Sequence, residues 1–128
     1  VRVRVDVRFR DLDPLGHVNN AVFLSYMELA RIRYFQRISP DWLEEGHFVV
    51  ARMEVDYLRP ILLGDEVFVG VRTVGGGRSR LRTEPLVTAS GEAGATGLGV
   101  LVWLEGGRPA PLPEAIRERI RALEGRPL

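Results

Sequence analysis

Residues 11–35 read DLDPLGHVNNAVFLSYMELARIRYF, and this stretch decides the fold. A polar, turn-forming run with two carboxylates, a proline, a glycine, a histidine and two asparagines passes directly into about five turns of apolar helix. Apolar residues lie on nearly every side of the helix, so we expect it to be buried inside a domain. Its charged residues and its short length argue against a membrane span. A buried helix thus begins where a cluster of reactive polar side chains ends, which is the arrangement of a site.

The rest of the chain predicts an antiparallel sheet. Valines alternate with charged residues over Val1–Phe9, which indicates a half-buried strand with a solvated arginine face. Asn19 is expected to cap the long helix, which ends at Ser39-Pro40 because the residue before a proline is pushed out of the helical conformation. The remaining expected elements are strands at Ala51–Tyr57, Glu66–Val74, Arg78–Ala89 and Ala95–Leu104 and a short helix at Pro113–Leu123.

Several residues refine this order of elements. Pro85 predicts that its strand is locally an edge or a bulge, and Gly97 and Gly99 indicate that another backbone comes close. Trp42 falls in the connection after the long helix. One long apolar helix needs a whole sheet face to cover it, so the predicted class is α+β. We expect a curved antiparallel sheet of about five strands wrapped around a long central helix, in a single domain spanning residues 1–128.

Composition excludes several classes of chemistry. The chain has 128 residues and a net charge of +1, which predicts no polyanion partner such as a nucleic acid. All 18 basic residues are arginine, so Schiff-base chemistry and a Walker-type phosphate lysine are excluded. Without cysteine there is no thiol nucleophile and no thiolate metal site. The lack of a signal segment or a spanning apolar run favours the cytoplasm and no membrane association.

The remaining reactive residues point away from metal and serine chemistry. His17 and His47 do not have the spacing of metal ligands, so no metal site is expected. None of the serines lies in a Gly-x-Ser-x-Gly elbow. The run GGGRSR at residues 75–80 resembles a phosphate-holding loop but lacks the helix that would follow one, so a hairpin tip is favoured.

The polar run before the helix is the remaining candidate site. Free amides at a helix start carry partial positive charge and can stabilise an oxyanion. A carboxylate beside them, such as Asp13, would act as a general base or a nucleophile in acyl transfer by hydrolysis. The alternative is structural: Asp11 and Asp13 cap turns, while His17 and Asn19 satisfy backbone groups at the helix start. These observations leave both interpretations open.

Residues 11–31, DLDPLGHVNNAVFLSYMELAR, resemble the opening motif of the 4-hydroxybenzoyl-CoA thioesterase family of hotdog-fold proteins, in its GHVNN acyl-CoA thioesterase branch. Arg59-Pro60 through Gly64-Asp65, Gly77-Arg78-Ser79 and the closing RPAPLPEAIRERI are also similar to family positions. The hotdog fold is the same sheet wrapped on a central helix. The resemblance therefore agrees with the expected fold and covers most of the chain.

The resemblance implies roles for the helix-start residues. The catalytic carboxylate would be Asp13, acting by attack on the carbonyl or by activating water. The backbone amide of Asn20 would polarise the thioester carbonyl. Gly16 would leave room for the thioester, while His17 and Asn19 would orient water or the carbonyl.

The resemblance also implies a substrate and an assembly. His17 and Asn19 replace apolar or aromatic residues of the 4-hydroxybenzoyl branch, which favours an aliphatic acyl group. Arg78 and Arg80 are candidates for binding the phosphates of CoA. Family members form dimers joined edge to edge, often paired into tetramers, with each site between subunits. The strand edges of this chain would need such cover.

The expected function is therefore an acyl-CoA thioesterase that releases free acid and CoA. It would use no cofactor, because CoA is part of the substrate, and it would form a dimer or a homotetramer. Two alternatives stay open, namely a hotdog hydratase or dehydratase that pairs Asp13 with His17, and a non-catalytic acyl-CoA binding module. RNA binding through the arginines of the first strand is disfavoured, because no stacking aromatic residues accompany them.

Overall fold

The computed structural model describes residues 1–39 and 46–128. The predictions for Pro40 and Trp42 lie outside the described residues. The elements are β1 (Arg2–Val5), the 3₁₀ turn η1 (Phe9–Asp11), α1 (Asn20–Ile38), β2 (His47–Tyr57), β3 (Val67–Gly76), β4 (Arg80–Ala89), β5 (Glu92–Glu105), β6 (Arg108–Pro109) and α3 (Glu114–Glu124).

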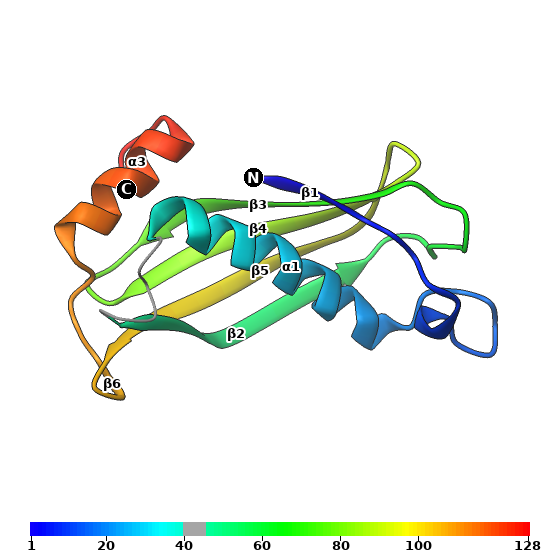
Figure 1. Cartoon of the computed structure of the whole chain (residues 1–128), viewed down its shortest axis with the longest axis horizontal. Helices are drawn as coiled ribbons and strands as arrows, with labels where there is room; N and C mark the ends of the chain where they lie inside the picture. The colour runs from blue at the N-terminus through cyan, green and yellow to red at the C-terminus, as the bar shows by residue number, and fades with distance from the viewer. Residues whose placement is uncertain (40–45) are drawn as a thin grey trace.

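The strands form one antiparallel sheet in the order β1-β3-β4-β5-β2, and the short β6 pairs with β5. The long helix α1 runs across one face of this sheet, and α3 lies at the end of the sheet that holds the C-terminal part of α1 (Figure 1). The predicted α+β class, a curved antiparallel sheet packed on a long helix, is confirmed. The sheet has one strand more than expected, since the two-residue β6 carries no sequence signal of its own.

Helix α1 buries one side against the sheet. The predicted N-cap is confirmed, because the Asn19 side chain accepts a hydrogen bond from the Ala21 amide at 2.9 Å. The opposite side stays open: Leu24, Leu29 and Ile32 are 41%, 48% and 37% exposed. The expectation of a helix covered all round is therefore wrong for the single chain, because one sheet can cover only one side of it. The buried residues are Phe23, Tyr26, Met27, Ala30, Tyr34, Phe35 and Ile38.

Strand β1 ends earlier than its alternation predicts. It stops at Val5, and the chain then folds into η1, where the Phe9 side chain is 81% exposed instead of buried. The cause is Asp11, whose Oδ2 accepts hydrogen bonds from the Arg8 amide at 3.0 Å and the Tyr26 hydroxyl at 2.7 Å. These two bonds hold a turn where the pattern of side chains alone indicates an extended strand.

Pro85 sits in the middle of β4, which has β3 on one side and β5 on the other. The prediction of an edge or a bulge at Pro85 is wrong. The register of β4 with β5 is the same on both sides of the proline, with Thr83 opposite Gly99 and Leu86 opposite Thr96. Pro85 keeps its pairing with Val71 of β3, while the pairing with β5 skips Glu84 and Pro85, since proline has no N–H to donate. The register shift of β4 against β5 falls between Val87 and Thr88, two residues after the proline.

Gly97 and Gly99 of β5 do make room for close neighbours. A Cβ on Gly97 would lie 2.6 Å from the carbonyl oxygen of Glu54 in β2, so the predicted backbone approach is confirmed there. At Gly99 the nearest atom is the Thr83 side-chain oxygen, at 2.8 Å from such a Cβ. The neighbour at Gly99 is therefore a side chain, which corrects the expectation for that residue.

The predicted C-terminal helix is confirmed as α3. Its apolar stripe is buried at Ile116 and Ile120, and Leu112, two residues before the helix, is buried as well. Its last turn is tied to the sheet, since Glu124 accepts hydrogen bonds from the Thr73 amide at 2.8 Å and from the Tyr34 hydroxyl. Within the described residues no helix is both long and apolar enough to cross a bilayer.

Candidate active site

The loop before α1 is a closed turn. The Asp13 amide donates to the His17 carbonyl at 2.7 Å, and the Gly16 amide donates to the Asp13 carbonyl at 3.0 Å. Leu12 and Val18 bridge the base of the turn. Gly16 has a φ of +84°, a conformation that side chains with a Cβ rarely adopt. Glycine is therefore favoured at position 16 of the motif, because it adopts this positive φ without strain.

The Asp13 carboxylate is held in one orientation by this turn. Its Oδ1 accepts hydrogen bonds from the Leu15 amide at 2.9 Å and the His17 amide at 3.2 Å. No hydrogen bond to Oδ2 occurs among residues 1–39 and 46–128. Oδ1 thus fixes the orientation of the side chain, and Oδ2 has no hydrogen-bond partner among the described residues.

A second loop, between β2 and β3, supports the turn from behind. The Val18 amide donates to the Ile61 carbonyl at 2.8 Å, and His17 bridges Leu62. Asp65 closes this second loop by accepting from the Leu62 amide at 2.9 Å. That backbone bond, together with a bond from the Ser90 hydroxyl, lowers the pKa of the Asp65 carboxyl below its usual 3.8.

The start of α1 presents a free amide beside the turn. Asn19 uses its own carbonyl to accept from the Val22 amide at 2.9 Å, and its amide donates to the Asp11 carbonyl at 2.8 Å. The Asn20 N–H has no acceptor within the part of the chain that the structure describes. First-turn amides of a helix have no intrahelical partner, so this N–H is one of the orphan donors of α1.

Asp11 anchors the loop to the helix through Tyr26. Burial raises the pKa of the Tyr26 hydroxyl, and its hydrogen bond to the Asp11 carboxylate raises that pKa further. Burial also acts to raise the pKa of Asp11, but the bonds from Tyr26 and the Arg8 amide outweigh it, so the net direction is down. Asp11 therefore serves as a turn cap, as the structural interpretation expected.

Asp13, which carries the carboxylate, and Asn20, which carries the free amide, both line one pocket of about 330 Å³. Of the predicted site residues, Asp13, His17 and Asn20 line it, whereas Gly16 and Asn19 lie next to it in the chain. The other lining residues are Val18, Phe23, Tyr57, Leu58, Arg59 and Pro60.

Tyr57 is the pocket residue that sequence reasoning missed. Its hydroxyl donates to the Asn20 carbonyl at 2.8 Å, and its ring meets the Phe23 ring edge-on at 5.1 Å. The sequence pattern identified Tyr57 only as the last residue of an expected strand. The signal that could have indicated Tyr57 is the Leu58-Arg59-Pro60 run directly after it. This run follows the end of β2 and lines the same pocket.

Arg78 and Arg80 are not brought to this pocket within one chain. Arg80 pairs with Val102 of β5, which in turn pairs with Val49 of β2. Tyr57 lies at the other end of β2, about 26 Å away at the usual rise per strand residue. The arginine hairpin and the pocket thus occupy opposite ends of the sheet.

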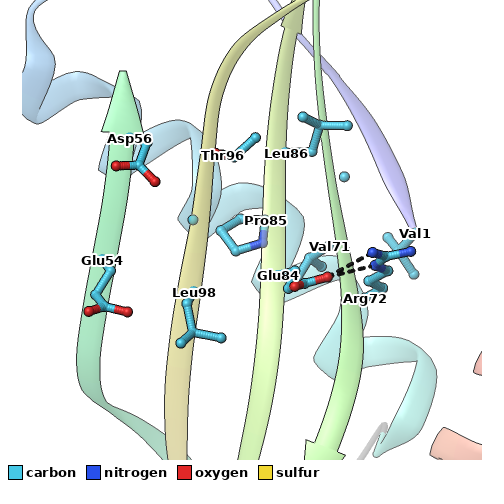
Figure 2. Close-up of a pocket in the computed structure, with 12 residues that line it drawn as sticks. Val1, Glu54, Asp56, Val71, Arg72, Glu84, Pro85, Leu86, Thr96 and Leu98 are labelled. Atoms are coloured by element: carbon cyan, nitrogen blue, oxygen red, sulfur yellow. Dashed lines mark hydrogen bonds and ion pairs between the residues drawn. The ribbon is translucent and has the colours of Figure 1, made fainter. Parts of the chain in front are cut away.

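A larger hollow of about 690 Å³ lies on the face of the sheet away from α1 (Figure 2). Glu54 and Asp56 border one side of it, and the Arg72–Glu84 ion pair borders the other. None of the predicted site residues lines this larger hollow, so the volume of a hollow does not by itself identify the active site. Among the described residues, no three His, Cys, Asp or Glu side chains cluster closely enough to hold a metal ion.

The antiparallel sheet packed on one long helix is the architecture of the hotdog class of proteins. The model of the thioesterase-like superfamily matches residues 7–120 of the chain. The chain belongs to this superfamily, and it is an enzyme of the thioester hydrolase class.

Individual relatives agree with this assignment. The chain is similar to a thioesterase from Thermus thermophilus whose crystal structure holds coenzyme A and Zn, with 94% identity, a TM-score of 0.94 and coverage of 99% of this chain and 96% of that one. A predicted thioesterase from Bacillus stearothermophilus matches with 28% identity, a TM-score of 0.88 and coverage of 99% and 98%.

Two curated proteins are also similar. The uncharacterized protein YsmA of Bacillus subtilis is 35% identical over 77% of this chain and 69% of its own length. The chloroplastic acyl-acyl carrier protein thioesterase ATL3 of Arabidopsis thaliana is 27% identical over 91% of this chain. The match spans 65% of the Arabidopsis protein's own length.

Proposed function

We propose that this protein hydrolyses an acyl-CoA thioester to the free acid and CoA. One observation carries the proposal: Asp13 and Asn20, whose backbone N–H is unpaired among the described residues, line the same pocket. The coenzyme A in the similar Thermus protein supports CoA as the carrier. The GHVNN motif supports membership of the acyl-CoA thioesterase branch, with an aliphatic acyl group as substrate.

In this proposal the thioester carbonyl oxygen accepts a hydrogen bond from the Asn20 N–H. That donor would stabilise the oxyanion by about 3 kcal/mol in the transition state. Asp13 Oδ2 either attacks the carbonyl carbon or takes a proton from an attacking water, while Oδ1 stays bound to the loop. In the water route the C–S bond breaks and the proton held by Asp13 passes to the leaving sulfur, which gives the free acid and the CoA thiol. In the nucleophilic route the C–S bond breaks to leave a mixed anhydride on Asp13, and water then hydrolyses this anhydride, which releases the acid, restores the carboxylate and supplies the proton for the CoA thiolate. No step needs a metal ion or a further cofactor.

Neighbouring residues would tune this reaction. His17 is a lining residue of the pocket and its side chain would orient the water, and Gly16 would leave space for the thioester. Asn19 caps the helix and so fixes the position of the next amide, which is that of Asn20. Asn19 would therefore affect the thioester carbonyl indirectly, through the position of the Asn20 backbone amide.

We further propose that a second copy completes the site. Strand β2 is an edge of the sheet, and its Val49 and Val50 are 37% and 42% exposed. Antiparallel pairing of two β2 edges would place the His47 end of one copy beside the Tyr57 end of the other. The Arg78–Arg80 hairpin of the second copy would then approach this pocket and could bind the CoA phosphates. Light scattering should give a dimer or a dimer of dimers, and a stable monomer would contradict this.

The test is free-thiol release from short, long, branched and aromatic acyl-CoAs by the wild type and Asp13→Asn. We expect the substitution to keep the fold and oligomer and to lower turnover by about a hundredfold or more, because the attacking or proton-accepting group is lost. A mutant with unchanged turnover would rule out the role of Asp13.

The same samples distinguish the alternatives. Hydration of a 2-enoyl-CoA without release of CoA would indicate the hydratase, in which Asp13 works with His17. Tight binding of acyl-CoA without turnover would indicate a binding module. Faster turnover of an acyl carrier protein thioester than of the matched acyl-CoA would change the carrier and leave the chemistry in place.

A further inference from the structure

The face of the sheet away from α1, here called the outer face, is apolar at its centre. Leu86 from β4 and Leu98 from β5 border the hollow there, and the Leu86 side chain is 42% exposed (Figure 2). Gly70 of β3 also lines the hollow and helps to keep it open, because glycine has no side chain to fill it. A hollow bordered by exposed leucines indicates a surface that another molecule covers.

One edge of the outer face is basic. In β1, Arg2 lies opposite Gly70 and Arg4 lies opposite Phe68 of β3. The guanidinium of Arg2 lies 3.9 Å from the centroid of the Phe68 ring, and this contact holds it over the outer face. Arg2 has no carboxylate partner within residues 1–39 and 46–128. Arg4 has only an exposed pair with Asp6 at 4.0 Å, which contributes little.

The other edge of the outer face is acidic. Glu54 and Asp56 of β2 border the hollow on this side (Figure 2). Glu54 forms an exposed pair with Arg52 at 2.8 Å. The Asp56 carboxylate has no ion pair and no hydrogen bond in the part of the chain that the structure describes. Unpaired charges of opposite sign therefore stand at the two edges of the same face.

The pairing of the strands places these charges symmetrically. One row across the sheet joins residues that lie opposite one another on neighbouring strands, in the order Arg2, Gly70, Leu86, Thr96 and Asp56. Leu86 belongs to β4, the middle strand of the order β1-β3-β4-β5-β2. The cation and the anion of this row are thus each two strands, or about 10 Å, from β4.

We propose that the outer face packs on the outer face of a second copy of this chain, around a twofold axis that runs along β4. Such an axis places β1 of each copy over β2 of the other, so that Arg2 and Arg4 of one copy face the carboxylates of the other. An axis across the strands would place β1 over β1 and oppose arginine to arginine. The charges therefore select the axis along β4.

The size and shape of the outer face suit this contact. The strands β2, β3, β4 and β5 have ten residues or more each. At about 4.8 Å between strands and about 3.3 Å per residue they cover about 600 Å². A standard interface buries about 800 Å² per partner, and β1 adds to the area of this face. Leu86 lies on the proposed axis, where it would pack against Leu86 of the second copy and fill the hollow.

The angle between packed sheets brings both carboxylates within reach of the arginines. Sheets that pack face to face cross at about 30°, which shifts residues two strands from the axis by about 5 Å along the strand. This shift is close to the distance between Glu54 and Asp56, which are two residues apart on β2. Arg2 and Arg4 would therefore contact this pair of carboxylates together.

This contact is distinct from the proposed pairing of β2 edges. Edge pairing joins backbone groups of β2, whereas the outer-face contact joins side chains that stand perpendicular to the sheet, so one chain can make both contacts. None of the residues that line the outer-face hollow lines the pocket of Asp13. The inference therefore does not depend on the proposed hydrolysis.

The test is the molar mass of the full chain, measured by sedimentation equilibrium at about 50 mM salt, where charge pairs are weakly screened. Arg2→Glu/Arg4→Glu should halve the mass, because it sets carboxylates against carboxylates. Glu54→Arg/Asp56→Arg should halve it as well. All four substitutions in one chain restore opposite charges across the interface and should return the mass to that of the wild type.

Two further variants separate the outer face from general effects of charge. Leu86→Asp leaves both edges intact and should also halve the mass, because it places two carboxylates on the axis. The matched control Arg33→Glu/Arg37→Glu makes the same change of charge on exposed residues of α1 and should keep the mass of the wild type. Asp13→Asn should keep it too. Circular dichroism confirms that each variant is folded.

A monomeric wild type would overturn the proposal, as would a mass that neither Arg2→Glu/Arg4→Glu nor Leu86→Asp changes. An equal loss of mass in the control on α1 would show only an effect of net charge and would also overturn it. If the chain with all four substitutions stayed at half the mass, the axis along β4 would be excluded. Variants that kept the mass but lost turnover of an acyl carrier protein thioester alone would assign the outer face to a carrier protein instead.

Discussion

Two hydroxyl contacts hold the helix start of this enzyme in place, and they tie it to different neighbours. Tyr26 fastens the first turns of α1 to Asp11 in the preceding loop. Tyr57 fastens the first residue of α1 to the end of β2 through the Asn20 carbonyl. An oxyanion donor has to be placed within about 0.5 Å of its productive position. The residues that fix the position of Asn20 therefore matter as much as the amide itself.

We expect Tyr57→Phe to lower kcat by about tenfold, which corresponds to about 1.4 kcal/mol of transition-state stabilisation. The substitution keeps the ring contact with Phe23 and removes only the bond to the Asn20 carbonyl. The Michaelis constant should change little, because the pocket keeps its shape. Steady-state kinetics with one acyl-CoA measures both constants.

Tyr34→Phe is the matched control for Tyr57→Phe. It also removes one hydroxyl, but that hydroxyl bonds to Glu124 and Thr73, away from the pocket residues. It should lower stability and leave kcat unchanged well below the unfolding temperature. Equal kcat values for Tyr57→Phe and the wild type would show that the Asn20 carbonyl needs no such tether.

At the scale of elements, the sequence predicted the helix ends that depend on hydrogen bonds between neighbouring residues. Asn19 and Ser39 bound α1 as expected, because capping uses neighbouring backbone groups. The early end of β1 depends instead on Tyr26, which is fifteen residues from Asp11 in the sequence. Tertiary hydrogen bonds of this kind leave no trace in hydrophobic alternation, which is why Phe9 was assigned to the wrong side.

The close approach of β2 and β5 is an element-scale feature that can be tested. We expect Gly97→Ala to destabilise the fold by about 1–3 kcal/mol, the usual cost of overpacking. The added methyl would sit 2.6 Å from the Glu54 carbonyl and 3.0 Å from Pro85 Cγ, so strands rather than side-chain ends must move. The midpoint of urea unfolding measures the change.

Gly77→Ala is the control for Gly97→Ala. A Cβ at Gly77 meets no atom within 4 Å, and its φ is not in the left-handed region. Its stability should therefore stay within about 0.5 kcal/mol of the wild type, as for most surface substitutions. If both variants unfolded at the same urea concentration, the close contact between Gly97 and the Glu54 carbonyl would not determine the stability of the fold.

At the scale of the whole molecule, the candidate site was predictable in part because one motif carries it. Asp13, His17 and Asn20 are neighbours in the sequence and neighbours in the pocket. Tyr57 joins them only after β2 has been placed beside α1. Residues that meet through the fold require the fold to be known.

Stability of the whole chain should fall in alkali because of two buried tyrosines. Burial raises the pKa of Tyr34 above its ordinary 10.0, and its hydrogen bond to Glu124 raises it further. The pKa of Tyr26 is also raised, by burial and by its hydrogen bond to Asp11. In the unfolded chain both hydroxyls lose their protons near pH 10, whereas the folded chain keeps them, so the unfolded state binds fewer protons above that pH. The contribution is thus complete below about pH 10 and is lost as the pH rises toward the folded pKa values.

We expect the free energy of unfolding, measured by urea titration, to drop by about 1 kcal/mol or more between about pH 9 and about pH 11. The double variant Tyr26→Phe/Tyr34→Phe has no hydroxyl to titrate at either site, so its stability should start lower and vary less over the same range. Tyr57 remains in both proteins and cancels in the comparison. A wild type whose pH dependence matched that of the double variant would mean that the two buried hydroxyls titrate alike in the folded and unfolded chain, against the burial and the bonds to Asp11 and Glu124.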